Sequence, residues 1–341
     1  MYLILALDED IHADAVLYYL KKLGKKVKRF DPAFLFDEYG SIEQGPRRDK
    51  LTVEINSTSG KITFSNGDEI LSDEVEGVFC RSFYFPKAKD SSSTEDMLAT
   101  AEIRSTVKGF FSLIPESCKW INNPYLEEKI DNKIYQHQCA VKLGLKVPDT
   151  LVTNNALKVK KFFNKNNGKI IIKQLSDISL IDESPYVNKY GFNDVEYKGF
   201  YTSVVTSSDL NNLEEYFGPG SSPVLLQEKL EKKSELRVTG VGDKFFSYRI
   251  FSQENDNSKV DFRHVDNLRT EKCQLSEEIS TKLVKMIKDW NISFAAVDLV
   301  ETVSGEVFFL EANVVGNWLW LEKEYDGSEI AFAIADLLLS Q

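Results

Sequence analysis

The sequence predicts an α/β protein, and three features support this fold class. The chain opens with MYLILAL, AVLYYLKKLG and KKVKRFD, which have the pattern of a strand, a helix and a second strand. Two further apolar segments, KIIIKQL and VLLQEKL, predict strands in the middle of the chain. Near its end, AAVDLVETVSGEVFFLEAN predicts two strands joined by a tight turn. Strands and helices in this order form α/β layers, and 341 residues suffice for two or three lobes.

The first part of the chain is expected to form a small α/β lobe. After the opening come the short alternating segments LTVEI and KITF, and then VEGVFCRSF, an apolar strand that would extend the opening sheet. KAKDSSSTED has the composition of an exposed loop, and MLATAEIRSTVKGFFSLI has the periodicity of a helix. The motifs GxGxxG and GxxxxGKS/T are both missing, so neither a dinucleotide site of the Rossmann type nor a P-loop is predicted.

The middle of the chain is expected to contain one helix and one long connection. Asn123-Pro124 would start a helix that Gly144 and Pro148 end. The boundary of the first domain is placed near Cys118. Residues 176–201, which are polar with scattered aromatic residues, join the two middle strands. A connection of this length without regular structure is usually functional or mobile.

Composition limits the classes of function. A hydrophobic content of 42% and an aromatic content of 12% are those of a globular protein. The net charge of -11 argues against general binding to nucleic acid or anionic membranes, although a local basic channel could still hold phosphates. No segment has the length of a membrane span, and MYLILALDED lacks the basic start of a signal peptide, so we expect a cytoplasmic protein. The cysteines are too widely spaced for zinc or a disulfide framework, and we expect buried thiols at Cys80, Cys118, Cys139 and Cys273.

The terminal hairpin sets two acidic side chains against each other. A two-residue turn at residues 304–305 defines the register of its strands. Counting outward from that turn places Asp298 opposite Glu311, with Asn313 on the same face as Glu311. Directly opposed Cβ atoms are about 4.5 to 5.5 Å apart, and like charges there destabilise a sheet. A positive charge is therefore expected between the two acids.

A divalent cation is the best candidate for that charge. The neighbouring residues are apolar on both faces, so water alone is not expected to relieve the repulsion. Magnesium takes oxygen ligands, typically one or two carboxylates together with substrate phosphates. We therefore predict that Asp298, Glu311 and the amide oxygen of Asn313 bind magnesium. The alternative is an ordinary solvated pair of acids on an exposed hairpin face.

Two lysines and three histidines are further candidates for a functional role. Lys173 ends the apolar strand KIIIK, which would present its ammonium at the strand end, but a lysine that reaches solvent from a strand end is equally ordinary. Lys133 lies on the predicted helix and by itself has the character of a surface charge. The histidines are isolated from one another and from any nucleophile, and a structural role is expected for His12, His137 and His264.

The ordered series of these segments resembles the ATP-grasp ligases, and among them the macrocyclases that build microviridin-type peptides, the graspetides. The resemblance rests on the opening and on NNPYLEEKIDNKIYQHQCAVKLGLKVPDTLVTN, KIIIKQL, LQEKLEKKSELRVTGVGD, VDFR, AAVDLV and LEANVVGNWLWLE. The last segment is the most specific, because its Trp-Leu-Trp end separates these macrocyclases from other ATP-grasp enzymes. Trp318 and Trp320 could equally be plain core residues. Val314 stands where the family often has Pro, and Asn317 where it has Gln, which leaves the shape of this loop open.

The resemblance implies an α/β ATP-grasp fold with an N-terminal pre-ATP-grasp α/β lobe. Residues 1–117 would form this N-terminal pre-ATP-grasp domain. Residues 118–205 would form the central ATP-grasp subdomain, and residues 206–341 the C-terminal ATP-grasp subdomain with the metal site.

The resemblance also implies roles for single residues. Lys133 and Lys173 would contact the ATP phosphates, and Glu235 would hold the ribose. The hinge strand beside adenine would consist of Gln227, Glu228, Lys229 and Leu230. The magnesium ions would be held by the residues that the hairpin predicts, Asp298, Glu311 and Asn313.

Two arginines match family residues near the phosphates and the substrate carboxylate, Arg237 and Arg263. A planar guanidinium suits oxyanions because it donates two parallel hydrogen bonds. Alternation of Val260 and Phe262 predicts a strand that carries Asp261 and Arg263 on one face. The alternative for Arg263 is a surface ion pair within this segment.

The implied activity is that of an ATP- and magnesium-dependent peptide macrocyclase. An Asp or Glu side chain of a ribosomal precursor peptide would be activated as an acyl phosphate and then joined to a Ser or Thr hydroxyl, or a Lys amine, of the same peptide. The partners would be the leader and core of that precursor and a second copy of the chain in a homodimer. One rival is a ligase that adds free amino acids to a peptide or protein carboxylate. Another is a catalytically silent peptide-binding protein of the same fold.

Overall fold

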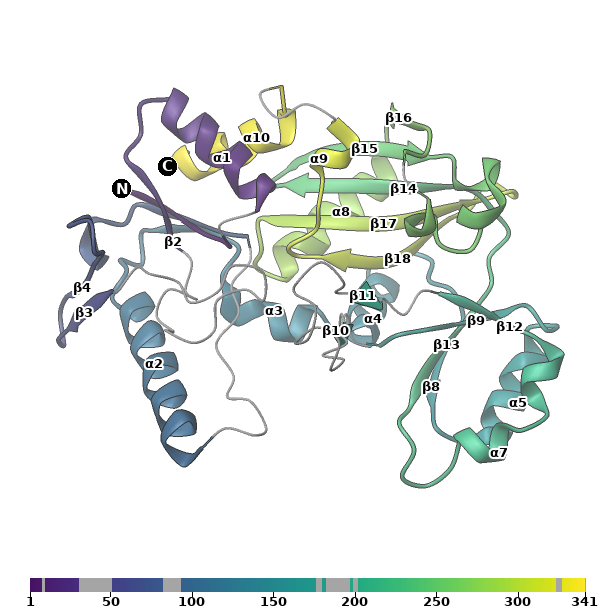
Figure 1. Cartoon of the computed structure of the whole chain (residues 1–341). Helices are drawn as coiled ribbons and strands as arrows, with labels where there is room; N and C mark the ends of the chain where they lie inside the picture. The colour runs from purple at the N-terminus through teal and green to yellow at the C-terminus, as the bar shows by residue number, and fades with distance from the viewer. Residues whose placement is uncertain are drawn as a thin grey trace, which may run out of the picture. The chain divides into compact units, whose positions relative to one another are not determined.

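The computed structural model describes residues 1–7, 10–30, 51–81, 93–175, 180–181, 197–198, 202–265, 267–322 and 327–340. Its helices and strands are labelled in Figure 1, and the chain divides into two compact units. Unit 1 comprises Met1–Leu126, Ile292–Phe294 and Asn317–Gln341, and unit 2 comprises Glu127–Asn291 and Ala295–Gly316. The predicted division into three domains, with boundaries after residues 117 and 205, stays a prediction.

Unit 1 is built on a parallel sheet with the strand order β2-β1-β6-β7. Its elements are β1 (Tyr2–Leu5), α1 (Ile11–Lys22), β2 (Val27–Phe30), β6 (Gly77–Cys80), β7 (Lys119–Ile121), α9 (Leu319–Glu322) and α10 (Glu329–Leu339). The helix α1 connects β1 to β2 and packs beside α10. The strand-helix-strand opening is thus confirmed, and β6 extends its sheet as predicted.

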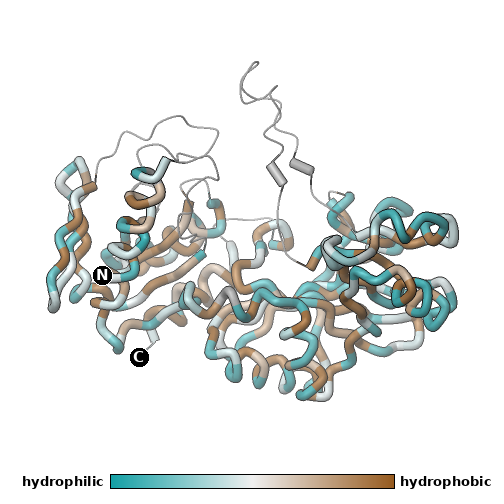
Figure 2. Tube along the Cα trace, turned by 90° about the horizontal axis from the view of Figure 1, so that it is seen from below, coloured by the Kyte–Doolittle hydropathy of each residue, from teal (hydrophilic) through white to brown (hydrophobic). Residues whose placement is uncertain are grey.

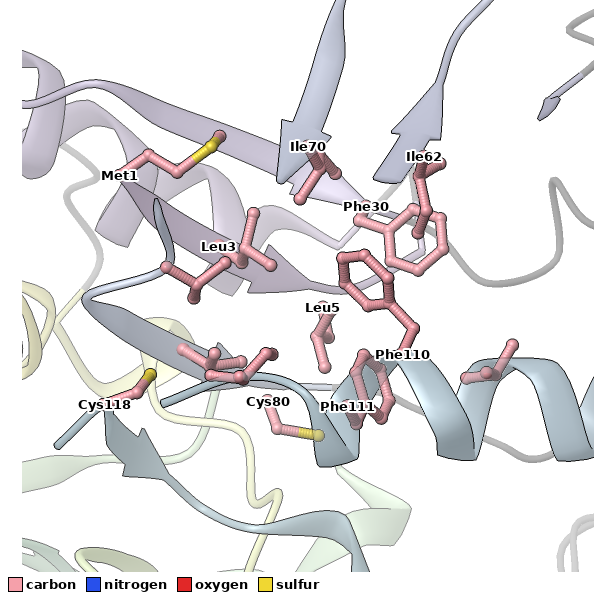
Figure 3. Close-up of a cluster of buried hydrophobic side chains, with 14 residues drawn as sticks. Met1, Leu3, Leu5, Phe30, Ile62, Ile70, Cys80, Phe110, Phe111 and Cys118 are labelled. Carbon is pink, nitrogen blue, oxygen red and sulfur yellow. The ribbon is translucent and has the colours of Figure 1, made fainter. Parts of the chain in front are cut away.

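A second, antiparallel sheet covers part of the core of unit 1. It consists of β3 (Thr52–Ile55), β4 (Gly60–Thr63) and β5 (Glu69–Leu71), and the long helix α2 (Thr94–Ser112) contacts β3. Figure 3 shows the buried side chains that these layers share with the parallel sheet, among them Met1, Leu3, Leu5, Phe30, Ile62, Ile70, Cys80, Phe110, Phe111 and Cys118. Burial of this apolar surface is the main stabilising contribution to the unit.

The four cysteines are free thiols, but only two of them are buried as predicted. Cys80 and Cys118 lie in the core of unit 1, where burial raises the pKa of the Cys118 thiol to about 12. Cys139 and Cys273 in unit 2 are partly exposed.

The Trp-Leu-Trp segment contributes to the core of unit 1. Trp318 is fully buried, and its ring centroid lies 4.4 Å from that of His12. Trp320 is 40% exposed. Asn317 accepts a hydrogen bond from Arg81 through its side-chain oxygen. The core assignment therefore holds for Trp318, and the buried His12 has the structural place expected of it.

Unit 2 contains an antiparallel sheet with the order β12-β9-β13-β8. Its strands are β8 (Thr150–Thr153), β9 (Ile170–Lys173), β12 (Ser203–Val205) and β13 (Val224–Glu228). The helices α5 (Ala156–Lys165) and α7 (Leu213–Tyr216) pack on this sheet around Ile170 and Leu226. Within the predicted long connection, β10 (Leu180–Ile181) pairs with β11 (Tyr197–Lys198), and its other residues lie outside the described ones.

The second sheet of unit 2 has the order β16-β15-β14-β17-β18. Its strands are β14 (Lys232–Val241), β15 (Lys244–Ile250), β16 (Thr270–Cys273), β17 (Phe294–Thr302) and β18 (Val307–Asn313). The helix α8 (Glu277–Asp289) lies on one face, where Ile287 packs against Gly240 of β14 (Figure 1). In Figure 2, hydrophobic segments run through the interior of the layers and hydrophilic segments lie at the outer turns. Short 3₁₀ helices span Ser72–Glu74, Ser207–Leu210, Ser252–Glu254, Asp256–Ser258 and Phe262–His264.

The predicted single helix after Asn123-Pro124 is in fact two helices, α3 (Pro124–Ile130) and α4 (Lys133–Lys142). The side-chain oxygen of Asn132 accepts hydrogen bonds from the N–H groups of Ile134 at 3.1 Å and Tyr135 at 3.0 Å. Asparagine is a favoured N-cap, so a new helix starts there. None of the helices in the described part of the chain is both long and apolar enough to span a membrane.

Candidate functional site

The predicted opposition of the two acids is confirmed. In the hairpin of β17 and β18, Asp298 pairs with Glu311 and Ala296 pairs with Asn313. The two acidic residues are mostly buried, with side chains that are 17% and 29% exposed. Repulsion between them is therefore only weakly screened by water and must be offset by other groups.

The turn that leads to this register differs from the predicted one. Thr302 donates its N–H to the carbonyl of Glu306 at 2.9 Å, and Gly305 has a φ of 83°. Residues 303–305 therefore form a three-residue loop with glycine in the left-handed region, instead of a two-residue turn. The longer loop shifts the pairing by one residue.

A β-bulge in β18 restores the register. Phe309 pairs with Leu299 and Glu311 pairs with Asp298, which leaves Leu310 as an extra residue in β18. The extra loop residue and the bulge offset each other, so counting from the wrong turn reaches the right pair. Bulges are frequent beside functional sites because they re-aim the side chains that follow.

Cationic side chains surround the two acids. Nη1 of Arg237 donates to both carboxylate oxygens of Asp298, at 2.9 and 2.8 Å. Nζ of Lys133 lies 3.4 Å from Oε2 of Glu311. Burial raises the pKa of Asp298, and Arg237 offsets part of this effect. Burial alone would also raise the pKa of Glu311, but Lys133, Lys173 and Arg263 together lower it.

The β9 lysine belongs to the same charged cluster. Burial lowers the pKa of Lys173, and the nearby carboxylates of Glu311 and Glu235 oppose this shift. Glu235 is paired in turn with Lys232, whose Nζ lies 3.0 Å from Oε1 of Glu235 and 2.9 Å from the carbonyl oxygen of Val260. Sequence reasoning missed Lys232, because one lysine in the charged run EKKSE offers no signal that separates it from its neighbours.

The segment around Arg263 is not the predicted strand. Asp261 caps the 3₁₀ helix Phe262–His264 by accepting the N–H of Arg263 at 3.1 Å, and this local bond competes with a strand ladder. The same carboxylate binds the guanidinium through Nε at 2.8 Å and Nη2 at 2.6 Å. Burial alone would raise the pKa of Asp261, but its bonds with Arg263 hold that pKa well below the usual range.

Arg263 therefore forms the local ion pair that was the alternative to a functional role. It also interacts electrostatically with Glu311 and Asp298. Asp261 is buried, whereas the side chain of Arg263 is 54% exposed. Besides Asp261, the carboxylates of Glu311 and Asp298 raise the pKa of Arg263. The guanidinium has five N–H donors, of which the two side-chain bonds to Asp261 use two.

The predicted hinge residues lie at the end of β13 and in the link to β14. The side chain of Gln227 is buried and donates to Oγ1 of Thr150 at 3.2 Å. The N–H of Glu228 bonds to the carbonyl of Asp149 at 2.8 Å, and the N–H of Lys229 bonds to that of Lys169 at 2.9 Å. Leu230 follows in the link between the two sheets of unit 2. Their place beside adenine stays a prediction.

The loop after β18 is tightly packed over Arg237. The amide oxygen of Asn313 accepts the N–H of Val315 at 2.8 Å, and Val314 is buried. A Cβ atom at Gly316 would lie 2.3 Å from Cβ of Ala296 and 2.9 Å from Nη2 of Arg237. Only glycine fits there, so this position requires glycine for space rather than for its φ.

We expect Gly316→Ala to lower the free energy of unfolding by about 1 to 3 kcal/mol, because the added methyl group forces its neighbours apart. Denaturant unfolding measures the change. Gly109→Ala in α2 is the control, since its Cβ would meet no atom within 4 Å. Alanine also has the higher helix propensity, so the control should keep or gain stability. Equal stability of the two variants would contradict the steric argument.

The donor set fits a divalent cation. Asp298, Glu311 and Asn313 offer two carboxylates and an amide oxygen, and each carboxylate has lone pairs beyond those used by Arg237 and Lys133. Among the described residues, no three His, Cys, Asp or Glu gather as a metal cluster. Two acids with an amide leave coordination positions for phosphate oxygens, which is the usual arrangement for magnesium in nucleotide sites.

The chain is similar to known proteins among the solved structures. No protein-family model matches the chain, and no curated protein matches it in sequence. Solved structures do match. The Chryseobacterium gregarium RiPP-associated ATP-grasp ligase, in complex with ADP and a leader and core peptide, has a TM-score of 0.78 and 25% identity over 99% of this chain and 95% of its own. Macrocyclase MdnC from Microcystis aeruginosa MRC, bound with precursor peptide MdnA, has a TM-score of 0.78 and 26% identity over 99% of both chains.

A third match comes from the same organism as MdnC. Macrocyclase MdnB has a TM-score of 0.73 and 26% identity over 99% of this chain and 98% of its own. These similarities cover both units and confirm the α/β ATP-grasp fold with its N-terminal lobe. The chain has the ATP-grasp fold and is similar in structure to RiPP-associated ATP-grasp ligases and macrocyclases, the group that its sequence motifs resemble.

Proposed function

We propose that the chain is an ATP- and magnesium-dependent ligase that forms macrocycles in a precursor peptide. The observation that carries this proposal is a face of unit 2 where Asp298 and Glu311 stand opposite each other within a cluster of four cations. The cations are Lys133, Lys173, Arg237 and Arg263. A bound triphosphate needs both cations and a metal site. Similarity to ligases solved with leader, core or precursor peptides supports a peptide as the substrate.

Each predicted residue then has a role. Lys133 and Lys173 bind the phosphates, Glu235 holds the ribose, and the Gln227 to Leu230 segment lies beside adenine. Asp298, Glu311 and Asn313 hold magnesium, which when bound would screen phosphate charge during phosphoryl transfer. Arg237 holds Asp298 in place through two hydrogen bonds, and Arg263 orients the carboxylate that reacts.

The reaction has two steps and needs no protein nucleophile. An oxygen of the substrate Asp or Glu carboxylate attacks the γ-phosphorus of ATP, and ADP leaves. A Ser or Thr hydroxyl, or a Lys amine, of the same peptide then attacks the acyl carbon, loses its proton and displaces phosphate. Each ring therefore consumes one ATP and removes one water from the peptide, as an ω-ester or an ω-amide.

Mass spectrometry tests this function directly. The purified protein is incubated with ATP, Mg²⁺ and a short peptide encoded beside its gene that carries repeats of Thr/Ser and Asp/Glu. The expected result is the loss of one water per ring. If the protein is instead a ligase for free amino acids, the peptide should gain the mass of an amino acid residue. If the peptide binds without ATP and its mass does not change, the protein is a catalytically silent peptide-binding protein.

A leaderless core peptide is expected to react at least about tenfold more slowly than the full precursor. Binding energy from a remote leader holds a weakly bound core in place. We propose β14, β15 and α8 as the platform for the leader. Rates are compared by mass spectrometry at equal concentrations, and adding the leader in trans serves as the control. Equal rates for both peptides would contradict a role for the leader.

We also propose that two copies of the chain form a homodimer. Two-fold dimers are the commonest soluble oligomers, and the family resemblance implies one. We place the reaction in the cytoplasm, since it needs ATP and a ribosomal peptide.

A further inference from the structure

The edge strand of the five-stranded sheet has an unusual set of partners. In the described strand order, β18 lies at the edge beside β17, so half of its backbone groups point away from the sheet. Buried backbone N–H and C=O groups need hydrogen-bond partners. The partners of Leu310 and Ala312 are side chains of α4, which lies beside β18 (Figure 1).

The side chain of Gln136 binds the backbone groups of Ala312 that a neighbouring strand would otherwise bind. Its Oε1 accepts the N–H of Ala312 at 2.8 Å, and its Nε2 donates to the carbonyl of Ala312 at 2.8 Å. Nε2 also donates to the carbonyl of Ile130 at 2.8 Å, and the residue is only 2% exposed. A side-chain amide has the donors and the acceptor of a peptide group, so it can bind both polar groups of one residue.

The neighbouring residues on α4 bind the adjacent positions of β18. Nε2 of His137 lies 2.8 Å from the carbonyl oxygen of the bulge residue Leu310. Lys133 pairs with Glu311. Positions three and four residues apart share one face of a helix, so Lys133, Gln136 and His137 together bind three consecutive residues of β18. His137 is therefore structural, as predicted, but its place is beside the site.

We propose that Gln136 is a positioning residue for the divalent metal site, acting through the backbone of Ala312. The residues on either side of Ala312 are Glu311 and Asn313, two of the three proposed ligands. Because both backbone polar groups of Ala312 are bound by one rigid amide, the orientation of its neighbours toward Asp298 is fixed before the metal arrives. The inference rests on the proposed function and names a residue to which sequence analysis gave no role.

Preorganisation makes a specific prediction about affinity. When the amide of Gln136 is removed, both backbone polar groups of Ala312 lose their partner, and the metal itself must order the ligands on either side. Residues that orient metal ligands typically contribute about 10- to 100-fold in metal affinity. Groups that bind nucleotide without metal, such as Lys173, are not held by Gln136. The substitution should therefore lower the affinity for Mg²⁺, whereas the affinity for nucleotide in the absence of Mg²⁺ should stay nearly unchanged.

The test measures ADP binding by calorimetry, with Mg²⁺ titrated and in EDTA. Mg²⁺ is expected to tighten ADP binding, and the Mg²⁺ concentration that gives half of this gain in affinity is the quantity measured. In Gln136→Leu this concentration is expected to be about tenfold higher than in the wild-type protein. ADP affinity in EDTA should stay within about twofold of the wild-type value. Saturating Mg²⁺ should restore most of the dehydration rate. Gln138→Leu is the matched control, because Gln138 is an exposed residue of the same helix and should leave the Mg²⁺ dependence unchanged.

The outcomes separate this inference from the proposed function. If Gln136→Leu has the wild-type Mg²⁺ dependence, Gln136 only stabilises the fold and the inference is overturned. If wild-type protein binds ADP without any effect of Mg²⁺, the proposed metal site itself fails. Should Gln136→Leu not fold, Gln136→Met replaces it, since an unbranched side chain of similar length fills the same space without hydrogen bonds. An unchanged Mg²⁺ dependence in Gln136→Met overturns the inference equally.

Discussion

Glu311→Gln is expected to lower the rate of peptide dehydration by at least about 10³-fold, because a carboxylate that helps hold the metal is lost. The substitution keeps the size of the side chain and removes its charge. Lys133, Lys173 and Arg263 lower the pKa of Glu311, so the charged form stabilises the folded protein at neutral pH. Some stability should therefore be lost, although repulsion with Asp298 is relieved at the same time. The protein should remain folded.

The measurement is a count of water losses over time at saturating ATP and Mg²⁺, with circular dichroism as the check on folding. Glu306→Gln is the matched control, because Glu306 is an exposed acid of the same hairpin and pairs with Lys146. It should react at the wild-type rate. A Glu311→Gln protein that dehydrates the peptide at near wild-type rate in ordinary Mg²⁺ would show that the metal assignment is wrong.

Arg263→Lys is expected to bind ATP normally and to lose about 10²-fold in the rate of cyclisation. Asp261 binds two donors of the guanidinium, and the carboxylates of Glu311 and Asp298 help to raise the pKa of Arg263. We infer that the remaining donors bind the substrate carboxylate and then the charge that develops on it. A lysine keeps the charge but cannot pair with Asp261 and the carboxylate in the same planar geometry.

Two measurements decide the role of Arg263. Calorimetry gives the affinity for ADP, and mass spectrometry gives the rate of dehydration. Arg269→Lys is the matched control, since Arg269 forms exposed ion pairs with Glu254 and Glu271 and should tolerate the change. Loss of ADP affinity in Arg263→Lys would assign the residue to the phosphates. Full activity would limit Arg263 to its ion pair with Asp261.

The sequence alone determines the fold class and much of the order of elements, because strand alternation and helix periodicity are local patterns. The sequence also predicts the opposition of Asp298 and Glu311, but by a count in which two errors cancel. That prediction succeeds although the turn was assigned one residue too short, because a bulge at Leu310 compensates. Two further local predictions fail at the capping residues Asn132 and Asp261, where a short polar side chain binds nearby backbone and starts a new helix or replaces a strand.

Only the tertiary structure decides what surrounds the two acids. The pattern Lys133, Gln136 and His137 predicts that three side chains share a helix face, but not which surface that face meets. Gln136 and Ala312 are 176 residues apart in the chain, and their contact depends on α4 packing against the outer edge of β18. The same holds for Lys173 from β9 and Arg237 from β14. Periodicity encodes the direction of a side chain within its own element, whereas the charge around a buried acid is set by how separate elements pack together.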